Sequence, residues 1–235
     1  MRVFIGFDPR PAEVQCYAVA RSSIRRRSST PVWTTGLVLS DLRQRGLYTR
    51  PTEVRDGRLF DVISNKPMST EFAISRFLVP ELCEHGWALF VDADVMARAD
   101  LYELYREADP SKAVMVVKHD YTPSGTMKMD GQVQLPYERK NWSSVMLFNC
   151  DHPANRMLTA TYVNVMPGLW LHQFKWLLDD EIGALDPKWN HLVGEKEANP
   201  NAAIAHFTLG SPSLPGYEDC EFAQEWRHEL DVWAA

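Results

Sequence analysis

The chain has 235 residues, 45% of them hydrophobic, and a formal net charge of −6 at pH 7. This apolar content is enough for a sizeable core, so an intrinsically disordered chain is excluded, and the acidic balance disfavours nucleic acid as a partner. The first residues form too short an apolar run for a signal peptide, and no stretch approaches the roughly 20 apolar residues of a membrane span. The four cysteines lie far apart in the sequence, which favours reduced thiols in a cytoplasmic protein over disulfides or a zinc site.

Strand-like and helix-like segments alternate from the N-terminus onwards. A short apolar run predicts a strand over 2–7, and the prolines after Asp8 are typical of a helix start, with the helix running to about residue 24. Residues 69–83 are predicted to form a helix that Pro80 kinks or ends. Further strands are predicted over 31–39, 87–91, 113–117, 144–150 and 202–207, and further helices over 100–107, 154–163 and 217–233. The alternation predicts an α/β fold with a mostly parallel sheet flanked by helices.

Two carboxylates follow the most apolar of these strands. The sequence ALFVDADV, from residue 88, places Asp92 and Asp94 directly after a buried run. Buried charge is costly without a partner, and ligands bind where the strands of such a sheet end, so we expect a cation there. Carboxylate oxygens suit Mg²⁺ or Mn²⁺, and an imidazole in the set shifts the preference towards Mn²⁺.

His206 also ends a strand-like apolar run, in AIAHFTLGSP. Its position makes it a candidate third metal ligand. A histidine in such a run is also a common core residue with a hydrogen-bonded ring, and at this point both interpretations stay open.

Five pieces of the sequence, taken together and in order, resemble a known family. They are FIGFD in the first strand, TEFAISRFLVPEL before LFVDADV, SSVMLFNC, LLDDEIGAL with PKWN, and HFTLGSP. They are similar to the GT-A glycosyltransferases, and most to the retaining, family-eight type related to glycogenin and bacterial galactosyltransferases. The resemblance implies one Rossmann-like domain over 1–235, with a nucleotide-sugar half over about 1–118, an acceptor and metal half over about 119–215, and a C-terminal helix over 217–233.

The resemblance also implies roles for individual residues. Asp92, Asp94 and His206 would bind the metal, and Asp92 with Ala93 would also contact the nucleotide. Phe7 and Asp8 would hold the base, and Arg76 and Gly210 would lie at the diphosphate. Asp179 and Asp180 match the acidic pair near the anomeric carbon, and Arg76 is counted with them as catalytic. The reaction implied is transfer of a sugar from a nucleotide diphosphate sugar, with UDP as the expected nucleotide, to an acceptor such as a glycan.

Two departures from the family pattern bear on the donor. No lysine follows the His-X-X-X-Gly motif in HFTLGSPSLPGY, although the family often carries one that binds the diphosphate. Trp142, Ser143 and Ser144 stand where the family usually has Asn-Ala-Gly. Retention can proceed through a carboxylate nucleophile, Asp179 or Asp180, or through attack on the face from which the nucleotide departs, and we favour the second.

Other segments have two interpretations. The stretch 119–141 is the candidate acceptor segment, with Lys118, His119, Asp120, Tyr137 and Lys140 in or beside it, and equally a solvated loop. The aromatic-rich residues 162–176 favour a helix packed on the sheet over a sugar platform. For the whole chain, a catalytically silent sugar-nucleotide or glycan-binding module is the main alternative. A sugar nucleotidyltransferase is disfavoured because FDPRPAE lacks a glycine-rich phosphate loop.

Overall fold

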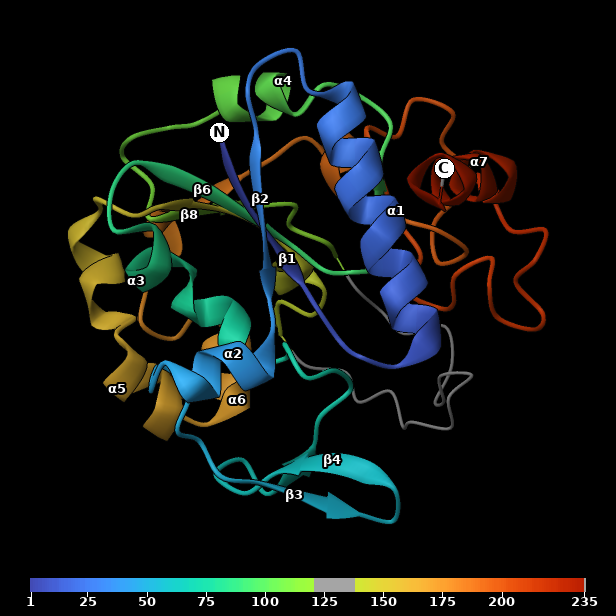
Figure 1. Cartoon of the computed structure of the whole chain (residues 1–235). Coiled ribbons are helices and arrows are strands. Elements are labelled where there is room, and N and C mark those ends of the chain that lie inside the picture. The colour runs from blue at the N-terminus through green and yellow to red at the C-terminus, as the bar shows by residue number, and fades with distance from the viewer. Residues whose placement is uncertain (121–137, 235) are drawn as a thin grey trace.

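A six-stranded sheet runs through the centre of the computed structural model, which describes residues 1–120 and 138–234 (Figure 1). Its strands are β1 Arg2–Gly6, β2 Trp33–Leu37, β6 Trp87–Val91, β8 Val114–Val116, β9 Val145–Asn149 and β10 Ile182–Ala184. Their order across the sheet is β10-β8-β9-β6-β1-β2. Strand β9 pairs antiparallel with β6 and β8, whereas the other neighbouring pairs are parallel, so the prediction of a mostly parallel sheet is confirmed.

Side chains alternate between the two faces of this sheet and build a core on each. Val3 and Ile5 of β1 pack on one face with Ile24 of the helix α1 (Pro11–Arg27). Phe4, between them in sequence, belongs to the core on the other face together with Phe90 of β6. Successive residues of these strands are apolar because both faces are covered.

Helices cover both faces of the sheet. Helix α1 lies against α7 (Ala223–Ala234) on one side, and α3 (Val79–Cys83) and α5 (Ala160–Val165) lie on the other (Figure 1). The other α-helices are α2 Leu39–Gln44, α4 Leu101–Arg106 and α6 Gly168–His172. Short 3-10 helices are η1 Ser75–Leu78, η2 Trp142–Ser144, η3 Pro153–Met157, η4 Asp179–Glu181 and η5 Pro187–Asn190.

Two three-stranded sheets complete the fold. The first has the order β11-β12-β7, with β11 His191–Leu192, β12 Ile204–His206 and β7 Val95–Ala97. The second has the order β3-β4-β5, with β3 Thr52–Arg55, β4 Arg58–Asp61 and β5 Lys66–Pro67. Strand β7 of the first sheet follows β6 in the chain, and this connection positions the metal-ligand candidates.

The predicted helix over 69–83 is wrong in its first part. Turns precede the 3-10 helix η1, and only Val79–Cys83 is α-helical. Pro80 lies in the first turn of α3, where its missing N–H group has no intrahelical partner to lose. The proline therefore begins a helix here, whereas the sequence analysis has it kink or end one.

Two other predicted helices are shorter than expected. Residues 153–157 form the 3-10 helix η3, and α5 begins at Ala160 because the Thr159 side chain accepts a hydrogen bond from the Tyr162 N–H. Helix α7 begins at Ala223 rather than near 217, since Phe222 has φ of 63° and cannot be helical.

No α-helix in the described part of the chain is long and apolar enough to cross a membrane. Strand β8, from the expected nucleotide-sugar half, pairs with β9 from the expected acceptor half. The two halves therefore share one sheet.

Candidate donor and metal site

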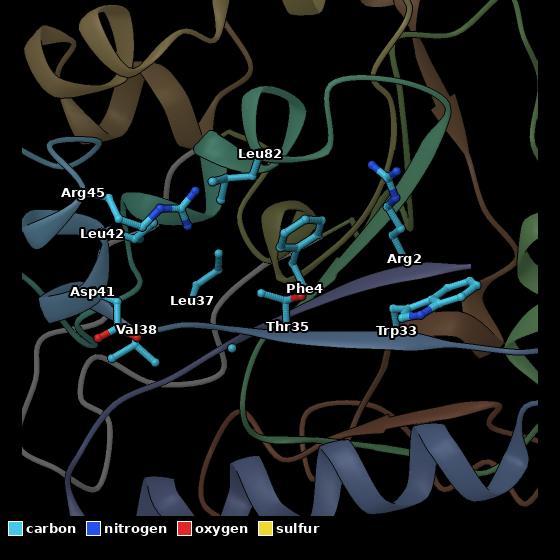
Figure 2. Close-up of a pocket in the computed structure, with 11 residues that line it drawn as sticks. Arg2, Phe4, Trp33, Thr35, Leu37, Val38, Asp41, Leu42, Arg45 and Leu82 are labelled. Atoms are coloured by element: carbon cyan, nitrogen blue, oxygen red, sulfur yellow. The ribbon is translucent and has the colours of Figure 1, made fainter.

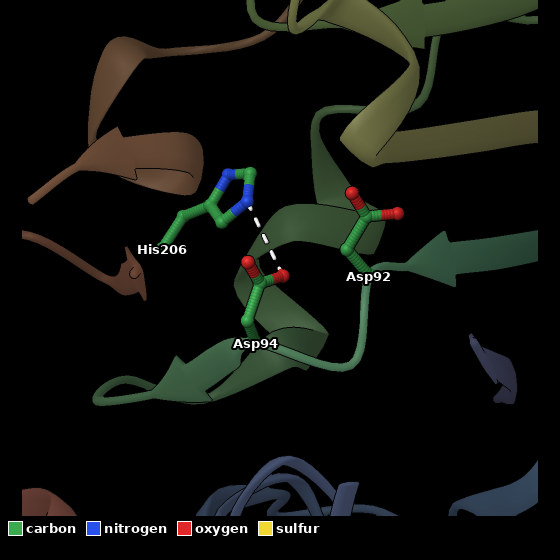
Figure 3. A group of neighbouring side chains, drawn as sticks. All are labelled: Asp92, Asp94 and His206. Carbon is green, nitrogen blue, oxygen red and sulfur yellow. Dashed lines mark ion pairs between the residues drawn. The ribbon is translucent and has the colours of Figure 1, made fainter. Parts of the chain in front are cut away.

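Strand ends bring two acids and one histidine together. Asp92 directly follows β6, Asp94 directly precedes β7, and His206 is the last residue of β12. Because β12 runs antiparallel to β7 with His206 opposite Val95, the imidazole lies beside Asp94. Figure 3 shows the three side chains converging from these separate segments, with one potential ligand atom of each within 4.8 Å of the others.

The donor set fits a hard divalent cation. The Asp94 Oδ1 atom lies 3.4 Å from His206 Nε2, and both aspartates keep some solvent exposure while His206 is buried. Two carboxylates and an imidazole nitrogen at these separations are ligands that Mn²⁺ takes, and Mg²⁺ accepts the oxygens.

Asn190 forms a hydrogen bond with the His206 ring. His206 Nδ1 lies 2.9 Å from Asn190 Oδ1, and Asn190 has no solvent exposure. The sequence analysis left His206 either as a metal ligand or as a hydrogen-bonded core residue. The structure shows a ring that is buried and hydrogen-bonded through Nδ1, with Nε2 directed at the acidic pair.

Arg76 lies beside this cluster. Its Nη1 atom is 2.7 Å from Asp92 Oδ1 and donates to the Ser143 carbonyl oxygen at 2.8 Å. The guanidinium carbon lies 5.3 Å from the centre of the Phe72 ring and 5.0 Å from that of Phe90, so aromatic rings support it. Its Nε atom is buried and finds no hydrogen-bond partner among the described residues.

Comparisons with known proteins identify the family and the fold of the chain. The chain is 45% identical over 238 residues to Protein CDI of Arabidopsis thaliana, covering 99% of this chain and 86% of that protein. The chain belongs to the CDI family. No family model matches it.

Among solved structures, this CDI-family chain is similar to the WbbM bifunctional glycosyltransferase, with a TM-score of 0.64, 16% identity and 98% of this chain covered. It spans only 49% of the WbbM chain. It is also similar to the galactosyltransferase LgtC in complex with donor and acceptor sugar analogues, with a TM-score of 0.57, 14% identity, and coverage of 99% of this chain and 96% of LgtC. These similarities establish that the CDI-family chain has the GT-A fold.

The Asp8 side chain of this CDI-family chain forms hydrogen bonds with Arg10 and Glu71. Its carboxylate accepts hydrogen bonds from the Arg10 side chain and backbone and from the Glu71 N–H, at 2.8 to 3.1 Å. Phe7 packs edge-on against Tyr17, and Ala93 is fully buried. Contact of Phe7, Asp8 or Ala93 with a nucleotide stays a prediction.

Gly210 has a packing reason to be glycine. A Cβ atom at this position would lie 2.5 Å from the Tyr217 ring, so the side chain of Tyr217 occupies the space that any larger residue would need. A role for Gly210 at the diphosphate stays a prediction.

Asp179 and Asp180 belong to the 3-10 helix η4, which directly precedes β10. The Asp179 side chain is 90% exposed and forms an ion pair with Arg139. The Arg139 guanidinium lies 5.7 Å from the centre of the Trp142 ring, in the segment that also carries Ser144. A role for Asp179 or Asp180 at the anomeric carbon stays a prediction.

The candidate acceptor segment is only partly described. Tyr137 and the rest of 121–137 lie outside the described residues. Lys118 is exposed, Lys140 is buried, and the His119 carbonyl oxygen accepts a hydrogen bond from Trp142 Nε1. Burial lowers the pKa of His119 to about 4, and the positive charge of the neighbouring His206 is the next cause.

Sequence reasoning missed Glu13, in the first turn of α1. Burial raises the pKa of Glu13 to about 7, and the nearby Asp94 carboxylate is the next cause; Arg10 acts in the opposite direction. A third acid therefore approaches the two candidate ligand carboxylates. The only sequence signal was its position one turn into the helix that follows the first strand.

A separate cavity of about 630 Å³ lies along the edge strand β2 (Figure 2). Arg2, Trp33, Asp41 and Arg45 are among the residues that line it. None of its lining residues is a predicted site residue, so the chemistry of the acidic cluster, rather than cavity size, defines the candidate site.

Proposed function

We propose that this protein is a retaining glycosyltransferase of the family-eight type. In this proposal it transfers a sugar, a hexose in the first instance, from a UDP-sugar to an acceptor hydroxyl in a Mn²⁺-dependent reaction. The observation that carries the proposal is the convergence of Asp92, Asp94 and His206 where β6 ends, with Arg76 beside them. The GT-A fold supports it.

Each of these residues has a task that follows from its surroundings. Asp92, Asp94 and His206 would hold the cation, which when bound supplies the charge that stabilises a departing nucleotide diphosphate. Arg76 has a buried Nε that finds no hydrogen-bond partner among residues 1–120 and 138–234, in addition to the Nη1 that pairs with Asp92. Its planar fork suits two oxygens of one phosphate group, and it compensates for the lysine that is missing after Gly210.

Retention of configuration fits attack on the face from which the nucleotide leaves. A carboxylate nucleophile would have to reach the anomeric carbon beside the cation. The Asp179 carboxylate is 90% exposed and already paired with Arg139, which favours a supporting role for it over a nucleophilic one. In same-face attack a phosphate oxygen takes the acceptor proton, so no side chain has to be a base.

The test is release of nucleotide from donor. Purified protein is incubated with Mn²⁺ and a panel of nucleotide sugars, and free nucleotide is measured with and without excess chelator. We expect release from a UDP-sugar that chelator abolishes. Full release in chelator would refute the metal-dependent reaction.

Matched variants separate loss of the site from loss of the fold. Asp94→Asn should remove metal-dependent release, whereas Asp100→Asn should not, because Asp100 caps α4 and accepts from the Ser29 N–H, and the asparagine oxygen can do both. Tight, Mn²⁺-dependent binding of UDP-sugar without release, in the presence of acceptors, would instead identify a silent binding module. A cytoplasmic location stays a prediction.

A further inference from the structure

We infer that Asn190 is the positioning residue for His206, because it selects the one neutral form of the imidazole whose unprotonated nitrogen, Nε2, faces the two acidic metal-ligand candidates. The consequence for metal binding rests on the proposed function. The form of the imidazole itself follows only from hydrogen bonds within this chain.

The orientation of the Asn190 amide is set by two acceptors. Its Nδ2 atom lies 3.3 Å from the Asn141 carbonyl oxygen and 2.9 Å from Ser144 Oγ. The backbone carbonyl can only accept, and the Ser144 hydroxyl spends its hydrogen on that same carbonyl at 2.7 Å, so it accepts from Asn190 as well. The amide nitrogen must therefore point at Asn141 and Ser144, and the amide oxygen at His206.

An amide oxygen can only accept a hydrogen bond. His206 Nδ1, at 2.9 Å from Asn190 Oδ1, must therefore carry a hydrogen. In a neutral imidazole only one nitrogen is protonated, so Nε2 then carries no hydrogen. The competing form, with the hydrogen on Nε2, would set two acceptors, Nδ1 and Asn190 Oδ1, against each other at 2.9 Å.

The same network reaches the first acidic ligand. The Ser144 carbonyl oxygen accepts a hydrogen bond from the Asp92 N–H at 2.9 Å. Ser144 thus contacts the backbone of one candidate ligand directly and the ring of another through Asn190. This gives a task to the Trp-Ser-Ser segment that replaces the family's usual Asn-Ala-Gly.

The first experiment needs no variant and no metal. Protein labelled with ¹⁵N-histidine is studied by long-range ¹H–¹⁵N NMR at about pH 9, well above the ordinary histidine pKa of about 6.5. The His206 signals are assigned by their loss in His206→Gln. We expect the hydrogen on Nδ1, and a hydrogen on Nε2 in the wild-type protein would overturn the inference.

The second experiment measures Mn²⁺ binding by the electron paramagnetic resonance signal of free Mn²⁺. Asn190→Ala should raise the dissociation constant about 10- to 100-fold, the usual effect of removing a residue that orients a metal-binding histidine. Asn190→Asp keeps an acceptor for Nδ1–H and should retain the Nδ1–H form. Unchanged Mn²⁺ affinity in a folded Asn190→Ala variant would refute the inference.

Asn155 supplies a matched control. It is also buried, donates to two backbone carbonyls and accepts from Trp176 Nε1, but it lies away from the cluster. Asn155→Ala should lower stability without changing Mn²⁺ affinity. If Asn190→Ala does not fold, Ser144→Ala decides, with a several-fold weaker affinity expected and an unchanged one refuting the inference.

The outcome is distinguishable from failure of the proposed function. Nδ1–H in the metal-free protein, combined with no release from any nucleotide sugar, would leave the positioning role intact and refute the transferase. Nucleotide release, combined with a hydrogen on Nε2 of His206, would support the transferase and refute the positioning role.

Discussion

Two buried arginine–aspartate pairs in this protein differ in how completely the guanidinium is used. Arg50 donates to both carboxylate oxygens of Asp61 at 2.6 Å, to Ser64 Oγ, and to the carbonyl oxygens of Val163 and Met166. Arg76 pairs with Asp92 and one carbonyl, and its Nε finds no partner among the described residues. The first pair is saturated and joins β4 to α5, whereas the second retains donor capacity next to the acidic cluster.

The two aspartates differ in the same sense. Burial raises the pKa of Asp61, but hydrogen bonds from Arg50 and Ser64 outweigh burial and hold this pKa below its ordinary value. Asp92 has other acids near it, and one of them, Glu13, has a raised pKa. A charged pair surrounded by donors stabilises the fold, and a charged pair beside further acids is suited to a cation.

The largest expected effect comes from breaking the saturated pair. Arg50→Ala would leave Asp61 buried without its main partner, so we expect the free energy of unfolding to fall by about 3–5 kcal/mol in urea titration. Arg106→Ala is the control, because its ion pair with Glu103 is exposed and should be worth less than about 1 kcal/mol. A loss below 1 kcal/mol for Arg50→Ala would show that the pair does not join the two regions.

The next effect concerns activity rather than stability. Arg76→Lys keeps the charge and the pairing with Asp92 but removes Nε and the planar fork. We expect kcat/KM for nucleotide release to fall about 100-fold, the usual cost of losing one donor to a developing charge, with a small change in melting temperature. Wild-type turnover in Arg76→Lys would mean that Arg76 is structural, like Arg50.

The smallest effect is a pH dependence that Glu13 should impose on the metal-free protein. A raised pKa means that the folded state binds this proton more tightly than the unfolded state, so stability falls as the pH rises from about 4.5 to about 7. We expect Glu13→Gln to remove this decline and to be about 2 kcal/mol more stable than wild type above pH 7.

Urea titrations of both proteins at several pH values, without metal, measure this difference. Saturating Mn²⁺ should reduce it, since a cation favours the charged carboxylate. Parallel stability curves for the two proteins between pH 4.5 and 7 would show that the pKa of Glu13 is not raised in the folded protein.

Much of the sheet could be predicted because its signals are local. The apolar run Trp87–Val91 coincides with β6, and its position next to Asp92 was enough to expect a cation. The helix over 69–83 failed because Pro80 is equally compatible with beginning and ending a helix. Local pattern alone cannot choose between the two.

The hydrogen bonds of the site were beyond prediction for a different reason. Asn190 meets Ser144 across 46 residues and His206 across 16, and these contacts exist only after β9 and β12 have paired with their neighbours. Glu13 approaches Asp94 through the placement of α1 on the sheet. Composition and spacing carry no record of such contacts, whereas the candidate ligands themselves were visible as acids and a histidine at strand ends.

The antiparallel pairing of β12 with β7 also has a consequence for synthesis of the protein. Asp92, Asp94 and β7 leave the ribosome well before His206 and its strand β12. A nascent chain that has already paired β1, β2 and β6 still lacks the third candidate ligand. The three side chains can therefore converge only in chains that have been translated past residue 206.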